Sequence, residues 1–422
     1  MGGVAHLGER IPCTDKVAGS IPVASTMSTN FFCPLPWNHL MFKSTGEVQA
    51  CCETYSDKFL PSESIKATAN NPIMRQLRLD LLEPNVVPSM CYKCSNREKF
   101  QNTSVRISSL GFDKYWTEQR AREATNPDGS MDNFILENLD IRWSNLCNYK
   151  CRFCSLQSSH SWLKDHKLQG KQVAEHFDPK TGIAEYDMDW KDLKTHLPHV
   201  RFIKLAGGEP TIMPGTYQLL EELIRVKNKS EISLITNATT VKYGQKDLLE
   251  LLKNFGGIVR IQMSMEGMGD VHEWSRSGKE DWHEIAENID KFYEYGQANN
   301  WRINFHSGIS WMNMYHLADF ILAYPHIPFV FNLVTNPAEM SIENFYRYEL
   351  EKCSEYYQSI ITQQQDHKVL KHLNVVKYAI DVAIQETKED IDLDKFRRTQ
   401  GLLDRSRNQS FAKAFPEWKR YA

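Results

Sequence analysis

Short apolar stretches alternate with amphipathic segments through the middle of the chain. The apolar stretches cover residues 138–144, 200–206, 231–236, 258–265, 302–310 and 329–335. Each has the length and composition of a buried strand, and the segments between them repeat apolar residues at helical spacing, as Ile285, Ile289 and Phe292 do. Six successive strand-then-helix units predict a parallel sheet with right-handed crossovers.

This pattern places the protein in the α/β class and leaves two architectures open. Six units are fewer than the eight of a closed barrel. A partial (β/α)6 TIM-like barrel and an open doubly wound sheet both satisfy the pattern. In the barrel, a substrate is expected at the carboxyl ends of the strands.

Regions of different composition flank this middle part. Residues 27–130 contain five cysteines, several prolines and short apolar stretches, and they predict a small cysteine-rich module with a hairpin and some helix. A turn-rich stretch at 126–130 separates this module from the strand-and-helix region, 131–340. Residues 341–422 are mostly helical in pattern, and their mildly basic end, 391–422, is typical of a solvated surface.

Residues 1–26 have no clear fold signal. The run Gly19-Ser20-Ile21-Pro22 matches the translated T-arm consensus of a tRNA gene. Two interpretations therefore stand: an upstream tRNA gene read in frame, with the native start at Met27, or a disordered tail. Either interpretation makes Cys13 a poor candidate for a metal ligand.

Composition narrows the classes of protein that remain. The 422 residues include 50 Lys plus Arg and 53 Asp plus Glu, a net charge of −3, which argues against a strongly basic nucleic-acid binder. No window approaches 18 uninterrupted apolar residues, so no transmembrane helix is expected. The chain has ten cysteines, several of them closely spaced, which indicates metal or cluster ligation and a reducing, cytoplasmic location.

Three cysteines follow the first predicted strand of the middle region. Cys147, Cys151 and Cys154 are spaced Cys-x3-Cys-x2-Cys. Three thiolates this close can hold three corners of a [4Fe–4S] cube and leave the fourth iron open to a small molecule. A closed zinc site would need a fourth ligand, for which His160 is the nearest candidate.

This spacing, with aromatic Phe153 before the last cysteine, resembles that of the radical S-adenosylmethionine (SAM) superfamily. The resemblance implies that the three cysteines ligate a [4Fe–4S] cluster whose open iron binds SAM, and that Phe153 packs near the adenine. It further implies that reductive cleavage of SAM gives a 5′-deoxyadenosyl radical, which abstracts hydrogen from the substrate. The fold it implies is the partial barrel.

Further motifs of that superfamily follow in the expected order. Gly207-Gly208-Glu209-Pro210 resembles the GGEP motif, whose backbone and carboxylate hold the methionyl amino group. Thr236-Asn237-Ala238 resembles Thr-Asn-Gly, with alanine in place of glycine. Ser264-Met265-Glu266-Gly267 resembles Ser-x-Asp-Gly, so that Ser264 is expected near the ribose or carboxylate of SAM. The resemblance also implies that Arg276 pairs with that carboxylate, and Asn313 after the fifth strand is a further candidate.

The N-terminal cysteines predict a second metal centre. Four thiolates are available, from Cys33, Cys51, Cys91 and Cys94. The last two form a Cys-x2-Cys knuckle. The hairpin with Gly46 five residues before Cys51 resembles that of SPASM/twitch auxiliary domains, which bind extra [4Fe–4S] clusters, although most relatives place this domain after the barrel. The same spacing favours Cys51 over Cys52. A zinc site with four thiolates satisfies the spacing equally.

Two functions from different classes follow. The first is a radical SAM oxidoreductase that acts on a peptide or small molecule and takes electrons from a donor such as flavodoxin or ferredoxin. The second is a catalytically idle zinc- or cluster-stabilised binding protein, against which the intact cysteine and GGEP motifs argue. An RNA-modifying enzyme finds little support in the near-neutral charge.

Overall fold

The computed structural model describes residues 31–54, 59–100, 104–279, 281–386 and 391–421. The predictions made for residues 1–26 and for Cys13 lie outside this part of the chain. The strands of the main sheet are β1 (His39–Phe42), β2 (Val48–Gln49), β3 (Asn138–Ile141), β4 (Phe202–Leu205), β5 (Glu231–Thr236), β8 (Ile258–Ser264), β9 (Arg302–Ile309) and β10 (Phe329–Leu333). A separate two-stranded ribbon consists of β6 (Lys242–Tyr243) and β7 (Lys246–Asp247).

The six strands predicted from the sequence are confirmed, and they pair in parallel. Across the sheet the order is β10-β9-β8-β5-β4-β3-β1-β2. From β3 to β10 the strands lie in the order of the chain, so the described chain winds in one direction without the reversal that marks a doubly wound sheet. This protein is therefore a mixed α/β protein built on a largely parallel sheet.

The N-terminal hairpin continues this sheet, which the sequence did not predict. β1 pairs in parallel with β3, with His39 opposite Asn138 and Phe42 opposite Ile141, and β2 pairs antiparallel with β1. All four residues of β1 are buried, so the strand shows no alternation of buried and exposed positions. Its sequence therefore does not indicate which strand it pairs with. The first cysteine-rich segment is thus joined by hydrogen bonds to the strand that precedes Cys147.

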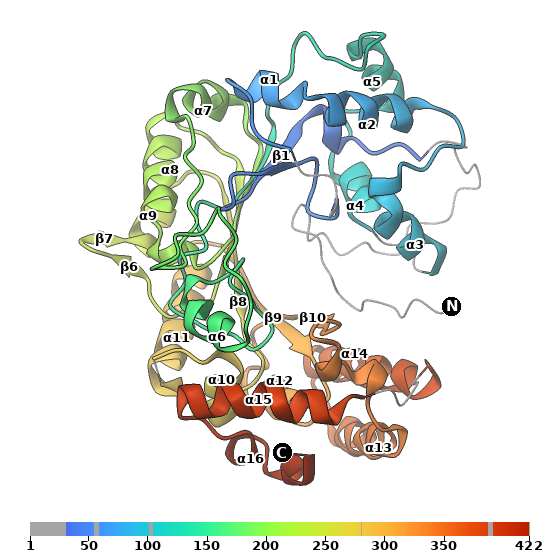
Figure 1. Cartoon of the computed structure of the whole chain (residues 1–422), viewed down its shortest axis with the longest axis vertical. Helices are drawn as coiled ribbons and strands as arrows, with labels where there is room; N and C mark the ends of the chain where they lie inside the picture. Colours follow the sequence, from blue (N-terminus) through green and yellow to red (C-terminus); the bar gives the residue numbers. More distant parts are fainter. Residues whose placement is uncertain (1–30, 55–58, 101–103, 280, 387–390, 422) are drawn as a thin grey trace.

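Helices cover one face and both ends of the sheet. Between the strands lie α6 (Leu163–Leu168), α7 (Trp190–His196), α8 (Pro214–Arg225), α9 (Leu248–Asn254), α10 (Gly269–Arg276), α11 (Trp282–Ala298) and α12 (His316–Ala323). The N-terminal helices are α1 (Ile65–Ala69), α2 (Pro72–Leu82), α3 (Tyr92–Phe100), α4 (Val105–Phe112) and α5 (Glu118–Ala124). In Figure 1, α8, α9 and α11 lie along the outer side of the curved sheet, and α1 to α5 lie at one end.

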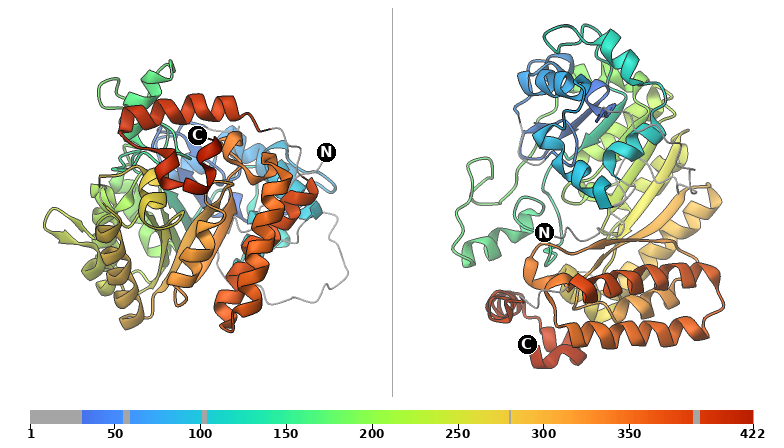
Figure 2. Two further views of the ribbon diagram at one scale, coloured as in Figure 1. Left: turned by 90° about the horizontal axis from the view of Figure 1, so that it is seen from below. Right: turned by 90° about the vertical axis from the view of Figure 1, so that its right-hand side faces the viewer.

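The other end of the sheet carries the C-terminal helices. These are α13 (Arg347–Gln363), α14 (His367–Glu386), α15 (Leu393–Arg407) and α16 (Phe411–Ala414), and the right-hand view of Figure 2 shows these orange and red helices in the lower part of the molecule. The basic end of the chain, residues 391–422, was expected to form a solvated surface, but several of its aromatic residues are buried. Trp311, after β9, packs against Phe396 at 5.0 Å and Trp418 at 5.8 Å, and all three are buried. This aromatic cluster attaches the C-terminal segment to the sheet.

The two faces of the sheet differ in polarity. On the helix-covered face, Phe305 stacks against Phe320 of α12 at 4.7 Å. On the other face, Asp140, Lys204, Ser233 and Arg260 stand side by side on four neighbouring strands, all buried. Parallel sheets covered on both faces are usually apolar on both. The polar face therefore marks the inner side of the curve as a place suited to a polar ligand.

No helix among the described residues combines the length and the apolar character needed to cross a membrane.

Candidate active site

The three cysteines after β3 converge on one loop. Cys147 and Cys151 are buried and Cys154 is half-buried. The thiol of Cys154 donates a hydrogen bond to Cys151, which, with the nearby Arg276 guanidinium, lowers the pKa of Cys151 to about 7 although burial opposes the change. The same hydrogen bond and burial raise the pKa of Cys154. Burial, and then the charge of Cys151, raise the pKa of Cys147.

This donor set fits three corners of an iron–sulfur cluster better than a zinc ion. Zinc needs a closed tetrahedron of ligands at about 2.3 Å from sulfur. Among the described residues, no three Cys, His, Asp or Glu side chains are arranged to hold a single metal ion, and this holds for both groups of cysteines. His160, the fourth zinc ligand considered from the sequence, accepts a hydrogen bond from the backbone N–H of Cys147 through Nδ1 at 3.1 Å. It therefore supports the cysteine loop through the backbone.

Gly207 and Gly208 bring the loop after β4 against the cysteine loop. The N–H of Gly208 donates to Ser144 O at 3.1 Å, and that of Glu209 donates to Leu146 O at 2.7 Å. A Cβ on Gly208 would lie 2.1 Å from Leu146 O, and Gly207 has a φ of +122°. From the resemblance, these glycines were expected to admit a ligand. In the structure they admit the backbone that immediately precedes Cys147.

Glu209 is buried and binds the protein itself. Its Oε1 accepts from Thr211 Oγ1 and Thr236 Oγ1, both at 2.8 Å, and its Oε2 accepts from the N–H of Asn237 at 2.6 Å. Burial raises the pKa of Glu209, and these hydrogen bonds oppose the increase. The carboxylate thus joins the loops after β4 and β5. Pro210 follows as the buried first residue of a short 3-10 helix, Pro210–Ile212.

A second contact joins the loop after β5 to the cysteines. Asn237 Nδ2 donates to Asn148 Oδ1 at 2.8 Å, and Asn148 Nδ2 donates to Thr239 Oγ1 at the same distance. Asn148 was missed by the sequence analysis, although its place inside Cys-x3-Cys is a usable signal. Ala238, at the position of glycine in Thr-Asn-Gly, has a φ of +58°, a region that glycine enters freely and alanine rarely.

In the structure, Arg276 is paired with a carboxylate of the protein. Its guanidinium donates to both carboxylate oxygens of Glu266, one of them at 3.0 Å, and its Nη1 lies 3.5 Å from Cys151 Sγ. Burial lowers the pKa of Arg276, but the charge of Glu266 and the nearby Cys151 and Cys154 raise it above its ordinary value. Glu266 was not predicted as a site residue. It binds Arg276, the arginine that the resemblance placed in the site.

The remaining predicted residues lie around this centre. Asn313 is buried and donates to Glu266 O at 2.8 Å, so it supports the loop after β8. Ser264 ends β8 opposite His306 of β9, on the polar face of the sheet. Phe153 is half-buried and packs against the core beside Cys154.

The structure also places Cys51, Cys91 and Cys94 within electrostatic range of Cys33. Burial raises the pKa of Cys33, and the nearby Cys91 and Cys94 raise it further. The pKa of Cys51 is raised by burial and then by Cys52, Cys33 and Cys91. Burial raises the pKa of Cys52 to about 12, and its charged neighbours are Lys204, Glu53, Asp140 and Arg142 instead of the distant cysteines. Of the two, Cys51 is therefore the one that interacts with Cys33 and Cys91, whereas Cys52 interacts with charged residues.

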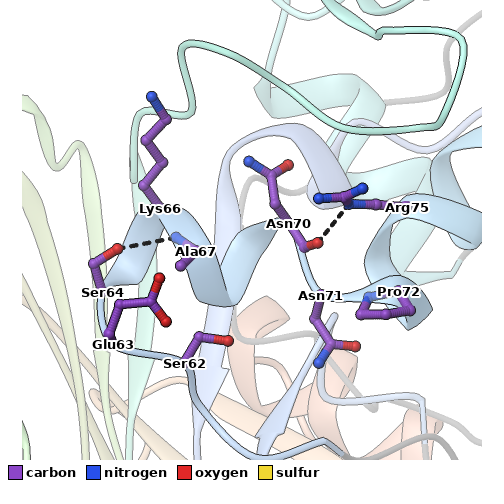
Figure 3. Close-up of a pocket in the computed structure, with 9 residues that line it drawn as sticks. All are labelled: Ser62, Glu63, Ser64, Lys66, Ala67, Asn70, Asn71, Pro72 and Arg75. Atoms are coloured by element: carbon purple, nitrogen blue, oxygen red, sulfur yellow. Dashed lines mark hydrogen bonds between the residues drawn. The ribbon is translucent and has the colours of Figure 1, made fainter.

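A surface pocket of about 510 Å³ lies elsewhere, between α1 and α2 (Figure 3). Its polar contacts are those of the two helix starts: Ser64 Oγ accepts from the N–H of Ala67, and Arg75 Nε donates to Asn70 O. None of the predicted site residues lines it. We attach no function to this pocket.

Comparison with known proteins finds similarity in the middle of the chain. Residues 141–321 match the model of the radical SAM superfamily. The sporulation killing factor maturation protein SkfB of Bacillus subtilis is 27% identical over 191 residues, which are 44% of this chain and 40% of that protein. A probable GTP 3′,8-cyclase of Sulfolobus acidocaldarius is 26% identical over 161 residues, 38% of this chain and 44% of its own. The matches thus span less than half of these curated relatives.

Two solved structures show weaker similarity. Native anSMEcpe with bound AdoMet has 17% identity and a TM-score of 0.35 over 53% of this chain and 60% of its own. SuiB of Streptococcus suis bound to the precursor peptide SuiA has 15% identity and a TM-score of 0.32 over 77% of this chain and 68% of its own.

Proposed function

Starting from the radical SAM domain of residues 141–321, we propose that this protein is a radical SAM oxidoreductase. Cys147, Cys151 and Cys154 would hold a [4Fe–4S] cluster with SAM at its open iron. When bound, this pair supplies reductive cleavage of SAM to a 5′-deoxyadenosyl radical that abstracts hydrogen from a substrate. The observation that carries the proposal is the convergence of these three thiols, beside Arg276, at the carboxyl end of the parallel sheet.

The chain's own residues fix the geometry of this site. Arg276 lies against Cys151 and favours its thiolate, and Glu266 keeps the guanidinium in place. Glu209 and the two glycines before it hold the loop after β4 on the cysteine loop. We assign SAM binding to this surface, with Phe153, Gly207, Gly208, Glu209, Pro210, Asn237, Ser264 and Arg276 as the contributing residues.

The proposed architecture is a partial (β/α)6 barrel at residues 131–340. Strands β3, β4, β5, β8, β9 and β10 supply its six units, and the one-directional strand order supports it. A twitch-like auxiliary domain at 27–130 and a helical region at 341–422 complete the proposed division. Because β1 extends the barrel sheet, the first two parts share one hydrogen-bonded sheet.

The N-terminal cysteines are the proposed ligands of a second metal centre. Cys33, Cys51, Cys91 and Cys94 would bind an auxiliary [4Fe–4S] cluster, with zinc as the alternative. Cys52, next in sequence to Cys51, lies near Lys204 and Asp140 of the polar face. A cluster held by these residues would supply electron transfer, whereas zinc would stabilise the fold alone.

The proposed substrate is a peptide or a polar small molecule. Asp140 and Lys204 form a buried ion pair at 3.5 Å on the inner face, and Asn332 and His306 form a polar pair nearer its carboxyl end. The name of SkfB, a maturation protein of a killing factor, supports a peptide. The reaction needs a reducing electron donor such as flavodoxin or ferredoxin, which would meet the enzyme in the cytoplasm.

Anaerobic reconstitution tests this function. Iron, sulfide and zinc are counted per chain, and 5′-deoxyadenosine is assayed with SAM and dithionite. About eight irons and cleavage of SAM are expected, against about four irons and one zinc if the N-terminal site holds zinc. The triple variant Cys147→Ala, Cys151→Ala, Cys154→Ala should lose cleavage and keep the N-terminal metal. A wild-type chain that binds metal but never cleaves SAM would favour the idle binding protein.

A further inference from the structure

Helix α15 contacts the cysteine loop, although 252 residues separate Arg152 from Asp404 in the chain. Arg152 lies between Cys151 and Cys154, and its side chain is fully buried. Its guanidinium donates to Asp404 Oδ1 at 2.6 Å, to Gln400 Oε1 at 2.9 Å and to Gln409 Oε1 at 2.8 Å. A buried loop arginine thus takes most of its partners from the C-terminal segment.

A second arginine makes the same connection in the opposite direction. Arg407, at the end of α15, donates through Nη1 to Lys150 O at 2.7 Å and pairs with buried Asp165 of α6 at 3.0 Å. Its guanidinium lies 4.7 Å from the centre of the Trp162 ring. Trp162 Nε1 in turn donates to Cys151 O at 3.0 Å. Arg407 therefore supports the loop through its backbone, at Lys150 O directly and at Cys151 O through Trp162.

Helix α10 belongs to the same hydrogen-bonded unit. Asp404 accepts from Trp274 Nε1 at 2.8 Å, and Gln409 Nε2 donates to Glu273 O at the same distance. The N–H of Arg152 donates to Ser275 O at 2.8 Å. Since α10 ends at Arg276, the segment from α15 to Gln409 holds the cysteine loop and the Arg276 helix against each other.

We propose that α15 positions the cysteine loop against Arg276, with Asp404 as the central positioning residue acting through Arg152. The inference rests on the proposed function and extends the site to the C-terminal region. Arg152 cannot lose its proton, so without Asp404 its buried charge would lose its ion-pair partner and the loop would have to move to find another. Asp404 contacts none of the three cysteines, which makes it a positioning residue and not a catalytic one.

The test uses Asp404→Asn in the full-length chain, with Asp394→Asn as the matched control. Asp394 is on the same helix with a side chain 79% exposed. In the metal-free chain, hydrogen exchange of the amides of residues 147–154 should become at least about tenfold faster in Asp404→Asn alone. In the reconstituted chain, the electron paramagnetic resonance signal of the reduced cluster should change and the KM for SAM should rise at least about fivefold.

A double variant separates positioning from general stability. Arg152→Met with Asp404→Asn removes both charges and leaves an amide oxygen to accept from Trp274 Nε1, so it should recover the melting temperature that Asp404→Asn alone loses. We expect it to keep the altered KM and cluster signal, because the loop is no longer held. Recovery of all three properties, or an Asp404→Asn variant that behaves as Asp394→Asn does, would overturn the inference. A wild-type chain that never cleaves SAM would instead refute the proposed function, while the exchange measurement would still decide the role of α15.

Discussion

The guanidinium of Arg276 lies between Cys151 and Glu266. Its Nη1 is 3.5 Å from Cys151 Sγ, and its other nitrogens donate to the carboxylate of Glu266. Both partners are buried or nearly so, which makes the arginine the counter-charge for a thiolate and a carboxylate at once. Because these groups are buried, water cannot compensate for the loss of the arginine's charge.

Arg276→Gln should therefore lower both cluster retention and SAM cleavage. The substitution leaves Glu266 buried without its partner, a change that commonly costs about 3–5 kcal/mol. We expect formation of 5′-deoxyadenosine to fall at least about tenfold, measured with iron content on the same samples. Arg225→Gln is the control, because Arg225 also pairs with a glutamate, Glu222, but is 63% exposed. Equal activity of the two variants would contradict this role.

Gly208→Ala should displace the cysteine loop. The new Cβ would lie 2.1 Å from Leu146 O, so the backbone beside Cys147 must move. Overpacking of this kind costs about 1–3 kcal/mol. We expect a lower melting temperature and a loss of iron from the site. Gly256→Ala serves as control, since no atom lies within 4 Å of its added Cβ and its φ is not positive. Full iron content in Gly208→Ala would contradict the observed contact between the loops.

Cys51→Ser and Cys52→Ser should differ in the metal they retain. Cys51 interacts with Cys33 and Cys91, whereas Cys52 faces Lys204 and Asp140. Metal analysis is expected to show loss of the N-terminal metal, whether about four irons or one zinc, in Cys51→Ser alone. The reverse result would transfer the ligand role to Cys52.

His39 should make the folded state less stable in mild acid. Burial, aided by Lys204 and opposed by Asp140, lowers its pKa to about 4. The unfolded chain, with the ordinary pKa near 6.5, then binds more protons between these values, so stability falls as the pH falls through that window. From about pH 7.5 to about pH 5.5 this histidine should account for roughly 1 kcal/mol of lost unfolding free energy.

Urea unfolding at both pH values checks this expectation. His39→Gln cannot take up the proton, so its stability should depend less on pH than that of the wild type. His283→Gln is the control, because that side chain is 82% exposed. An unchanged pH dependence in His39→Gln would show that the histidine is not responsible.

The motifs of the site could be found from sequence because each lies in a short, contiguous stretch. Cys147, Cys151 and Cys154 belong to one loop, and Gly207 to Pro210 belong to another. The roles of those residues were less predictable. Gly208 makes room for Leu146 O, and Arg276 binds Glu266, because each contact joins residues from different strand-to-helix loops.

The sequence by itself determined the six strands, the helices between them and the two groups of cysteines, since apolar periodicity and ligand spacing are local properties. Only the tertiary structure decided that β1 pairs with β3, that Gly208 meets Leu146 O, and that Arg152 pairs with Asp404. A strand whose four residues are all buried does not identify its neighbour, and a charged residue in a helical pattern does not show whether it meets solvent or an opposite charge. Those partners are brought together by the folding of segments far apart in the chain.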